Sequence, residues 1–257
     1  MAQLLCTVRP CHEPLQREER RVVCARGHSF DIARSGYINL LQPQDRRAAE
    51  PGDNAEAVAA RRRFLDRGFA QPLLEAVRDL TARAPAILDA GCGEGYYLGT
   101  IGRGSGVDIS TAAIDLAARR YPQCEWIVAN ADRFIPYADG SFDCVMSITG
   151  RLNAPEFHRV LKPGGTLIVA VSAPEDLIEL RGRANRDRLQ RTVEMFSDFS
   201  VVQHRRVSNR AELDAAAIRD LLAATYRPRK GDGEPQEARV VTLALDIIQF
   251  ERIANRE

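Results

Sequence analysis

Lysine is almost missing from this sequence. Lys162 and Lys230 are the only lysines among 36 basic residues, so the rest are arginines. Asp and Glu number 35, and the formal net charge is only +1, so no global basicity indicates a nucleic-acid-binding protein. Arginine suits phosphate and base recognition, but a bias this broad is most simply explained by the composition of the source genome and cannot be assigned to one site.

A long apolar run is also lacking. No stretch of about 18 apolar residues occurs, so no membrane-spanning helix is indicated. Residues 1–6 do not place a charged segment before a long apolar stretch, so we expect no signal peptide and a cytoplasmic protein. Six cysteines in such a chain are not expected to form disulfides, but three of them fall within the first 24 residues and require another explanation.

The chain divides into three zones. The first, 1–42, holds three cysteines, two histidines and short β-like runs, and we expect a small domain there. The second, 43–80, begins as a polar stretch and continues with helical periodicity, which predicts a helical connector. The third, 81–257, is long enough for a complete domain with its own core.

From residue 86 onward, short apolar runs alternate with helical segments. Strands are expected at 87–90, 125–128, 142–148, 165–171 and 239–250, and helices at 55–67, 71–83, 110–120 and 155–161. Ser110 is suited to cap the third of these helices. Alternation of strands and helices predicts a mostly parallel sheet covered on both faces, so the fold class is α/β with a doubly wound sheet.

A glycine-rich turn follows the first of these strands. Residues 89–95 read Asp-Ala-Gly-Cys-Gly-Glu-Gly, and the glycines let backbone amides approach a ligand closely. Open α/β sheets bind ligands at the carboxyl ends of their strands, which is where this turn lies. Asp89 precedes the glycines, and the pattern is not the Gly-x-Gly-x-x-Gly that seats a pyrophosphate. Since S-adenosylmethionine carries an ammonium group and no phosphate, the turn favours that cofactor over a dinucleotide.

Two further acids follow the next two strands. Asp108, in Gly106–Ser110, can accept both hydroxyls of a ribose, and Asp132 is placed to take the adenine amino group. Only fourteen positions separate Glu94 from Asp108, so the first helix of the domain must be short. The expected cofactor-binding residues are Asp89, Gly91, Cys92, Gly93, Gly95, Tyr96, Tyr97, Leu98, Asp108, Ile109, Asp132 and Ser147.

The N-terminal cysteines have the spacing of a metal site. Cys6-x4-Cys11 is followed by Cys24-x3-His28, which is the form of a zinc ribbon with four tetrahedral ligands. His12 is a competing ligand, and a ribbon that has lost its metal is the alternative. The three other cysteines are expected to be single buried residues: Cys92, Cys124 and Cys144.

These motifs together resemble known families. The spacing of Asp89, Asp108 and Asp132, with the turn Leu161-Lys-Pro-Gly-Gly165, resembles class I methyltransferases, which have a Rossmann-like sheet. At a finer level, the chain resembles the bacterial 23S rRNA guanine-N1 methyltransferases, which begin with a zinc ribbon. The segments that carry this resemblance are 11–15, 27–41, 51–56, 60–68 and 91–97. The likeness covers residues 6–180 well and the last third weakly.

The resemblance implies methylation of a guanine N1 in a hairpin of 23S rRNA. It further implies bound zinc, a ribbon that helps to hold the RNA, and a homodimer. The sequence departs from the family at 147–153, where an aromatic-Ala-Pro segment is usual in front of the acceptor, and at Ala70, where an aromatic residue is usual. The altered segment and the near-neutral charge favour, as an alternative, a small-molecule, biosynthetic methyltransferase that keeps the ribbon as a structural cap. A third alternative is a protein that binds RNA or S-adenosylmethionine without turnover, but the intact Asp89–Gly95 loop with Asp108 argues against loss of the cofactor.

Arginines and aromatic residues are the expected RNA contacts. Two arginine groups are candidates for the RNA backbone: Arg46, Arg47, Arg61, Arg62, Arg63 and Arg67 in the connector, and Arg181, Arg183, Arg186, Arg188 and Arg191 in the last third. Candidates to stack on a flipped-out base are Tyr96, Tyr97, Phe64 and Arg151, although each is equally suited to a place in the core. The sequence indicates no general base.

Overall fold

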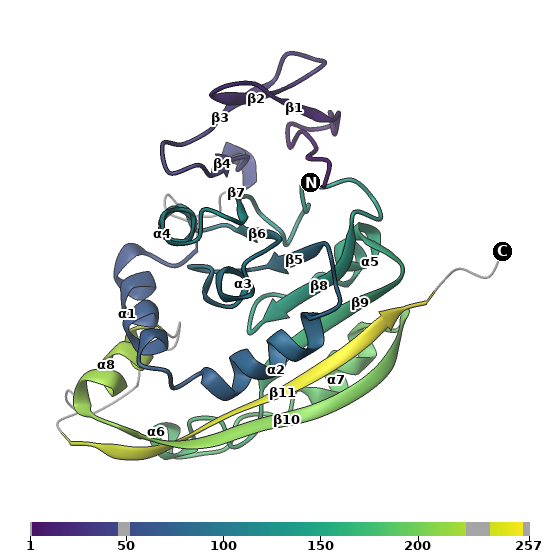
Figure 1. Ribbon diagram of the computed structural model, residues 1–257. Helices are drawn as coiled ribbons and strands as arrows, with labels where there is room; N and C mark the ends of the chain where they lie inside the picture. The colour runs from purple at the N-terminus through teal and green to yellow at the C-terminus, as the bar shows by residue number, and fades with distance from the viewer. Residues whose placement is uncertain (1, 46–51, 225–236, 254–257) are drawn as a thin grey trace.

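The structure is a computed structural model that describes residues 2–45, 52–224 and 237–253. Its centre is an eight-stranded sheet with the order β10-β11-β9-β8-β5-β6-β7-β4 (Figure 1). The strands are β4 (Ile38–Asn39), β5 (Ile87–Ala90), β6 (Ser105–Asp108), β7 (Glu125–Val128), β8 (Phe142–Ile148), β9 (Leu161–Ser172), β10 (Phe199–Leu213) and β11 (Arg239–Arg252). Neighbours from β4 to β9 pair in parallel, whereas β11 and β10 pair antiparallel at one edge. The predicted α/β class is confirmed.

Alternating side chains of the strands point to opposite faces, and each face is buried. Leu88, Val145 and Leu167 belong to one apolar cluster, while their neighbours Ile87 and Cys144 belong to another. The helices are α1 (Ala55–Asp66), α2 (Gln71–Thr81), α3 (Tyr96–Ile101), α4 (Thr111–Arg120), α5 (Ala154–Val160), α6 (Ile178–Arg181), α7 (Leu189–Met195) and α8 (Ala215–Ala223), with a 3₁₀ turn at Pro43–Asp45. A sheet covered on both faces presents its ligand-binding edge only at the strand ends.

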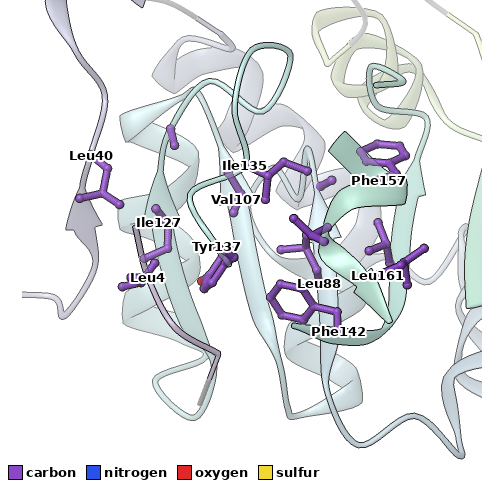
Figure 2. Close-up of a cluster of buried hydrophobic side chains, with 14 of the residues drawn as sticks. Leu4, Leu40, Leu88, Val107, Ile127, Ile135, Tyr137, Phe142, Phe157 and Leu161 are labelled. Atoms are coloured by element: carbon purple, nitrogen blue, oxygen red, sulfur yellow. The ribbon is translucent and has the colours of Figure 1, made fainter. Parts of the chain in front are cut away.

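A small three-stranded antiparallel sheet is formed by β1 (Leu15–Arg17), β2 (Arg21–Cys24) and β3 (Ser29–Asp31). Cys24 ends β2, whereas Cys6 and Cys11 lie in the segment before the sheet. The next strand, β4, leaves this sheet and pairs in parallel with β7 of the large sheet, with Ile38 opposite Ile127. Figure 2 shows Leu4 and Leu40 beside Ile127 and Tyr137, in one buried cluster. The small sheet and the large one therefore share a continuous core.

The predicted strands and helices are confirmed within a few residues at their ends. The side chain of Ser110 caps α4 by accepting a hydrogen bond from the backbone N–H of Ala113 at 3.2 Å. The first helix of the domain, α3, has only six residues, as the short spacing requires. The fifteen-residue strand β10 was not expected, because it is an edge strand rich in exposed polar residues and lacks a clear apolar pattern. Among the helices of the described residues, none has both the length and the hydrophobicity needed to cross a bilayer.

Candidate functional site

The glycine-rich turn joins β5 to α3 at the carboxyl edge of the sheet. Its geometry depends on Gly95, which has a left-handed φ of 76°. A Cβ at this position would come within 2.4 Å of the buried ring of Trp126, so no larger residue fits. The turn therefore packs closely against Trp126, and its Gly91 and Cys92 amides donate hydrogen bonds to the Val107 carbonyl in β6.

Asp89 is buried at the start of this turn, with a relative exposure of 1%. Its Oδ1 has no hydrogen-bond partner among the described residues. Burial, followed by the charges of Asp108 and Glu94, raises the pKa of this carboxyl well above its usual value. An orphaned carboxylate oxygen beside two like charges fits a cationic ligand, and the ammonium group of S-adenosylmethionine is such a ligand.

Asp108 lies at the end of β6, next to the turn. Its Oδ2 accepts a hydrogen bond from the Gly93 N–H at 2.9 Å, and its Oδ1 accepts one from the Ser110 N–H at 2.8 Å. Burial raises the pKa of Asp108, although these two amide donors act in the opposite direction. The two donors fix the carboxylate in place, and each oxygen keeps a lone pair with which it can accept a ribose hydroxyl.

Glu94 and Arg61 complete the charged surroundings of the turn, and sequence reasoning gave neither a role at this site. The Glu94 carboxylate is 2% exposed and lies 3.5 Å from Arg61 Nη1. Arg61 comes from α1, in the connector, and also pairs with Asp53. Asp53 belongs to segment 51–56, which contributes to the family resemblance, but nothing in the sequence of this segment indicates that Asp53 pairs with Arg61.

Asp132 follows β7, and Ser147 lies near the end of β8; β5 and β6 lie between these two strands in the sheet. Asp132 Oδ2 accepts a hydrogen bond from Arg151 Nη1 at 2.6 Å. Asp132 and Arg151 line an open cavity of about 490 Å³. The other residues that line it are Asn130, Arg133, Gly150, Leu152, Arg188 and Met195. Ser147 is fully buried, and its hydroxyl reaches the Arg151 carbonyl at 3.4 Å. The departing segment 147–153 therefore forms one wall of this cavity.

Other expected cofactor residues face the core. Leu98 is fully buried in an apolar cluster that includes Ile87 and Trp126. Tyr96 is 8% exposed and packs in a cluster with Phe64. Cys92 is a buried free cysteine, and burial raises the pKa of its thiol well above the usual value. Gly91 and Ile109 lie partly buried in the loops after β5 and β6, and Tyr97 lies partly buried in α3. Phe64 and Tyr96 are thus core residues rather than exposed stacking platforms.

Four connector arginines, expected from sequence as candidates for RNA contact, form ion pairs or hydrogen bonds within the protein. Arg62 is 7% exposed, with Nε 3.0 Å from Asp66 and Nη1 3.1 Å from the Tyr121 hydroxyl. Arg63 and Arg67 form ion pairs with two acids near the C-terminal side of the chain, Asp220 and Asp214. Arg46 and Arg47 lie outside the described residues.

The predicted metal ligands come together. The ligand atoms of Cys6, Cys11, Cys24 and His28 all lie within 4.8 Å of one another. His28 Nδ1 is 3.4 Å from the sulfurs of Cys6 and Cys24, and the sulfurs of Cys11 and Cys24 are 3.8 Å apart. Three thiols and one imidazole at such distances suit a tetrahedral Zn²⁺ site. The competing ligand His12 instead stacks on Phe134, with ring centroids 4.3 Å apart.

Comparisons with known proteins agree with this geometry. A family model described as a methyltransferase domain matches residues 87–165, and one described as "RlmA, N-terminal", a zinc ribbon, matches residues 5–49. A solved S-adenosylmethionine-dependent methyltransferase from Thermotoga maritima covers 77% of this chain and 100% of its own, with a TM-score of 0.51 and 19% identity. The fold and the matched domain place the chain among the class I S-adenosylmethionine-dependent methyltransferases, here with a zinc ribbon.

Two curated relatives narrow the class. The chain is 35% identical over 182 residues to the 23S rRNA (guanine(748)-N(1))-methyltransferase of Streptomyces fradiae. The aligned region covers 66% of this chain and 64% of that relative. It is also 34% identical over 211 residues to a Micromonospora griseorubida protein that is provisionally named as a 23S rRNA (guanine-N1)-methyltransferase. The aligned region covers 71% of this chain and 70% of that relative. The chain belongs to the 23S rRNA (guanine-N1)-methyltransferase family, as the resemblance predicted.

Proposed function

We propose that this protein transfers a methyl group from S-adenosylmethionine to N1 of a guanine in a hairpin of 23S rRNA. The observation that supports this most is the likeness to the Streptomyces fradiae enzyme, because that likeness extends over 182 residues, more than the 79 residues that the methyltransferase model matches. The aligned part spans 64% of that relative's length, so the activity is inferred for this chain rather than carried over whole.

The cofactor would be held by the acids and amides of the turn. Asp89 would pair with its ammonium group, which would satisfy the orphaned Oδ1, and Asp108 would accept its ribose hydroxyls. Bound there, S-adenosylmethionine supplies an electrophilic methyl group on a sulfonium. The protein's task is then to align the acceptor with that methyl group in a fixed geometry, which alone lowers the barrier by several kcal/mol.

The cavity next to this turn is the proposed acceptor site. It lies beyond β7 and β8, and Asp132, Arg151 and Gly150 line it. A guanine must leave its stack to enter such a site, at a cost of a few kcal/mol. The planar guanidinium of Arg151, held by Asp132, can stack on the base or bind its edge.

The RNA backbone would run over the second arginine group rather than over the connector. Arg183, Arg186, Arg188 and Arg191 are all exposed, and Arg188 also lines the cavity. Guanidinium groups bind phosphates through paired donors, and neutralised phosphates release counterions. We therefore expect RNA affinity to fall steeply with rising salt concentration.

Each of the three zones of the chain would have its own role. The ribbon, residues 1–42, would bind zinc through Cys6, Cys11, Cys24 and His28 and help to hold the RNA. The connector, 43–80, would join it to the methyltransferase domain, 81–257. Action on ribosomal RNA would place the protein in the cytoplasm. The family resemblance also implies a homodimer, which light scattering of the purified protein tests.

The deciding experiment is methyl transfer to a 23S rRNA hairpin fragment, with the product identified as N1-methylguanosine by nucleoside mass spectrometry.

One observation favours a second function, a small-molecule methyltransferase: the segment 147–153, which departs from the family, forms a wall of the acceptor cavity. If zinc-loaded enzyme ignores both the fragment and whole 23S rRNA but methylates a metabolite, the RNA substrate is refuted.

A further inference from the structure

The connector, which lies outside the matched methyltransferase domain, contacts both loops of the proposed cofactor site. The Ser110 hydroxyl donates a hydrogen bond to the Asp53 carbonyl at 2.6 Å, and the Asp53 carboxylate pairs with Arg61. Arg61 in turn reaches Glu94 in the glycine-rich turn. Since Asp108 joins the turn to Ser110 through two backbone amides, these contacts close a ring around the site.

Close packing shows that the connector is seated firmly on these loops. Gly52 has a φ of +84°, and a Cβ there would lie 2.9 Å from both Ile109 Cγ2 and Ser110 Cβ. A Cβ on Gly93 would lie 3.0 Å from Arg61 Nη1. The guanidinium therefore lies directly against the turn, at van der Waals distance from its backbone.

The charges make Arg61 the important member of the ring. Glu94 is almost fully buried, and Asp53 and Asp108 also lie near the same guanidinium. Arg61 Nη2 further donates to the Ala224 carbonyl at 3.3 Å, so the end of α8 helps to orient the guanidinium. Without Arg61, the Glu94 carboxylate would remain buried close to Asp89 with its principal counter-charge removed. Such a charge is expensive in a low-dielectric site and would drive the turn to open.

We propose that Arg61 is a positioning residue that holds the glycine-rich turn in its cofactor-binding conformation by neutralising Glu94 and anchoring it to the connector. Arg61 acts through Glu94 and touches no reacting atom. The inference rests on the proposed function only in taking S-adenosylmethionine as the ligand of the turn, and it does not depend on the methyl acceptor.

The test is calorimetric binding of S-adenosylmethionine to the full chain. Arg61→Gln should weaken binding roughly ten- to hundredfold, the loss expected when a charged hydrogen bond is removed. Arg61→Lys should restore affinity to within a few fold, because it restores the charge. The double variant Arg61→Gln/Glu94→Gln should recover most of the loss, because no unpaired charge then remains on Glu94. The matched control is Arg63→Gln, from the same helix, whose partner Asp220 lies in α8.

Two outcomes would overturn the proposal. One is an Arg61→Gln variant that binds as tightly as the unmodified protein. The other is a double variant that binds no better than Arg61→Gln, since the loss would then come from general unfolding rather than from Glu94. Where methyl transfer is measurable, Arg61→Gln should raise KM for S-adenosylmethionine and leave kcat at saturation nearly unchanged. Unmodified protein that binds the cofactor but does not methylate RNA would refute the proposed substrate and leave the binding test of Arg61 intact.

Discussion

Replacing Asp89 by Asn should stabilise the ligand-free protein and weaken cofactor binding at the same time. Asp89 is 1% exposed, its Oδ1 has no hydrogen-bond partner in the part of the chain that the structure describes, and Asp108 and Glu94 add like charges nearby. A buried charge without compensation costs several kcal/mol, whereas an unpaired neutral amide costs about 1–3 kcal/mol. The Asp89→Asn substitution should therefore raise the free energy of unfolding by about 1–3 kcal/mol at neutral pH. For a domain of this size, each kcal/mol corresponds to roughly 2–4 °C in Tm.

The same substitution removes the proposed partner of the cofactor's ammonium group. A hydrogen bond to a charged group contributes about 1.5–3 kcal/mol, which corresponds to a roughly ten- to 150-fold weaker Kd. Cofactor at 100 times Kd stabilises the unmodified protein by about 2.7 kcal/mol, and a hundredfold weaker Kd leaves about 0.4 kcal/mol at the same concentration. Thermal melting with and without S-adenosylmethionine should therefore show a higher starting Tm and almost no shift on adding the cofactor.

A pH series sharpens this test. The raised pKa of Asp89 means that its protonated form is favoured in the folded protein, so its contribution to stability is complete below its ordinary pKa of 3.8 and is lost as pH rises through the raised value. The Asp89→Asn variant should lack this loss. The matched control is Asp143→Asn, because Asp143 is paired with Lys162 and accepts the Ala86 N–H, so its replacement should lower Tm and spare cofactor affinity. An Asp89→Asn variant with a lower Tm, or with unchanged affinity, would refute this reasoning.

Three further predictions concern other parts of the molecule. The purified protein should contain about one zinc per chain, and its removal should unfold the small sheet of β1, β2 and β3 while β4 and the methyltransferase domain stay folded, as amide exchange would show; an ordered, metal-free small sheet would contradict this. Gly106→Ala should cost about 1–3 kcal/mol in thermal melting, because its Cβ would lie 2.4 Å from the buried ring of Trp126. Burial opposes ionisation of Asp246, but hydrogen bonds from Arg206 and His204 lower its pKa, so Asp246→Asn should lower Tm at pH 7, and the deficit should shrink as pH falls through the lowered pKa.

Local patterns made much of the fold and cofactor loop predictable. The strand at 87–90, the glycine turn and the short helix after it all depend on residues within a few positions of one another, so spacing alone indicates them. The zinc ligands were equally predictable, because their residue types are rare and their spacing is regular. Strand β10 was not, since an exposed edge strand carries little apolar periodicity.

Long-range pairing accounts for what the sequence could not show. Arg61 reads as one of several arginines on a helix, and only the fold brings it to Glu94 and to the Ala224 carbonyl. The same holds for Arg63, whose partner Asp220 is distant in the chain. A row of arginines suggests RNA contact from sequence, but the sequence does not show which of them the fold places beside an acid.

The pairing of β4 with β7 has a consequence for dissecting this enzyme. Ile38 and Asn39 cover the outer edge of the parallel sheet, although the sequence places them at the end of the ribbon. A shortened protein that starts at residue 43 would leave the N–H and C=O groups of β7 unpaired along that edge, together with the apolar surface that Leu4 and Leu40 normally cover. Uncovered strand edges recruit other strands, so such a protein would self-associate. We therefore expect that removing the ribbon would expose the domain to aggregation and would not isolate the RNA-binding role proposed for the ribbon.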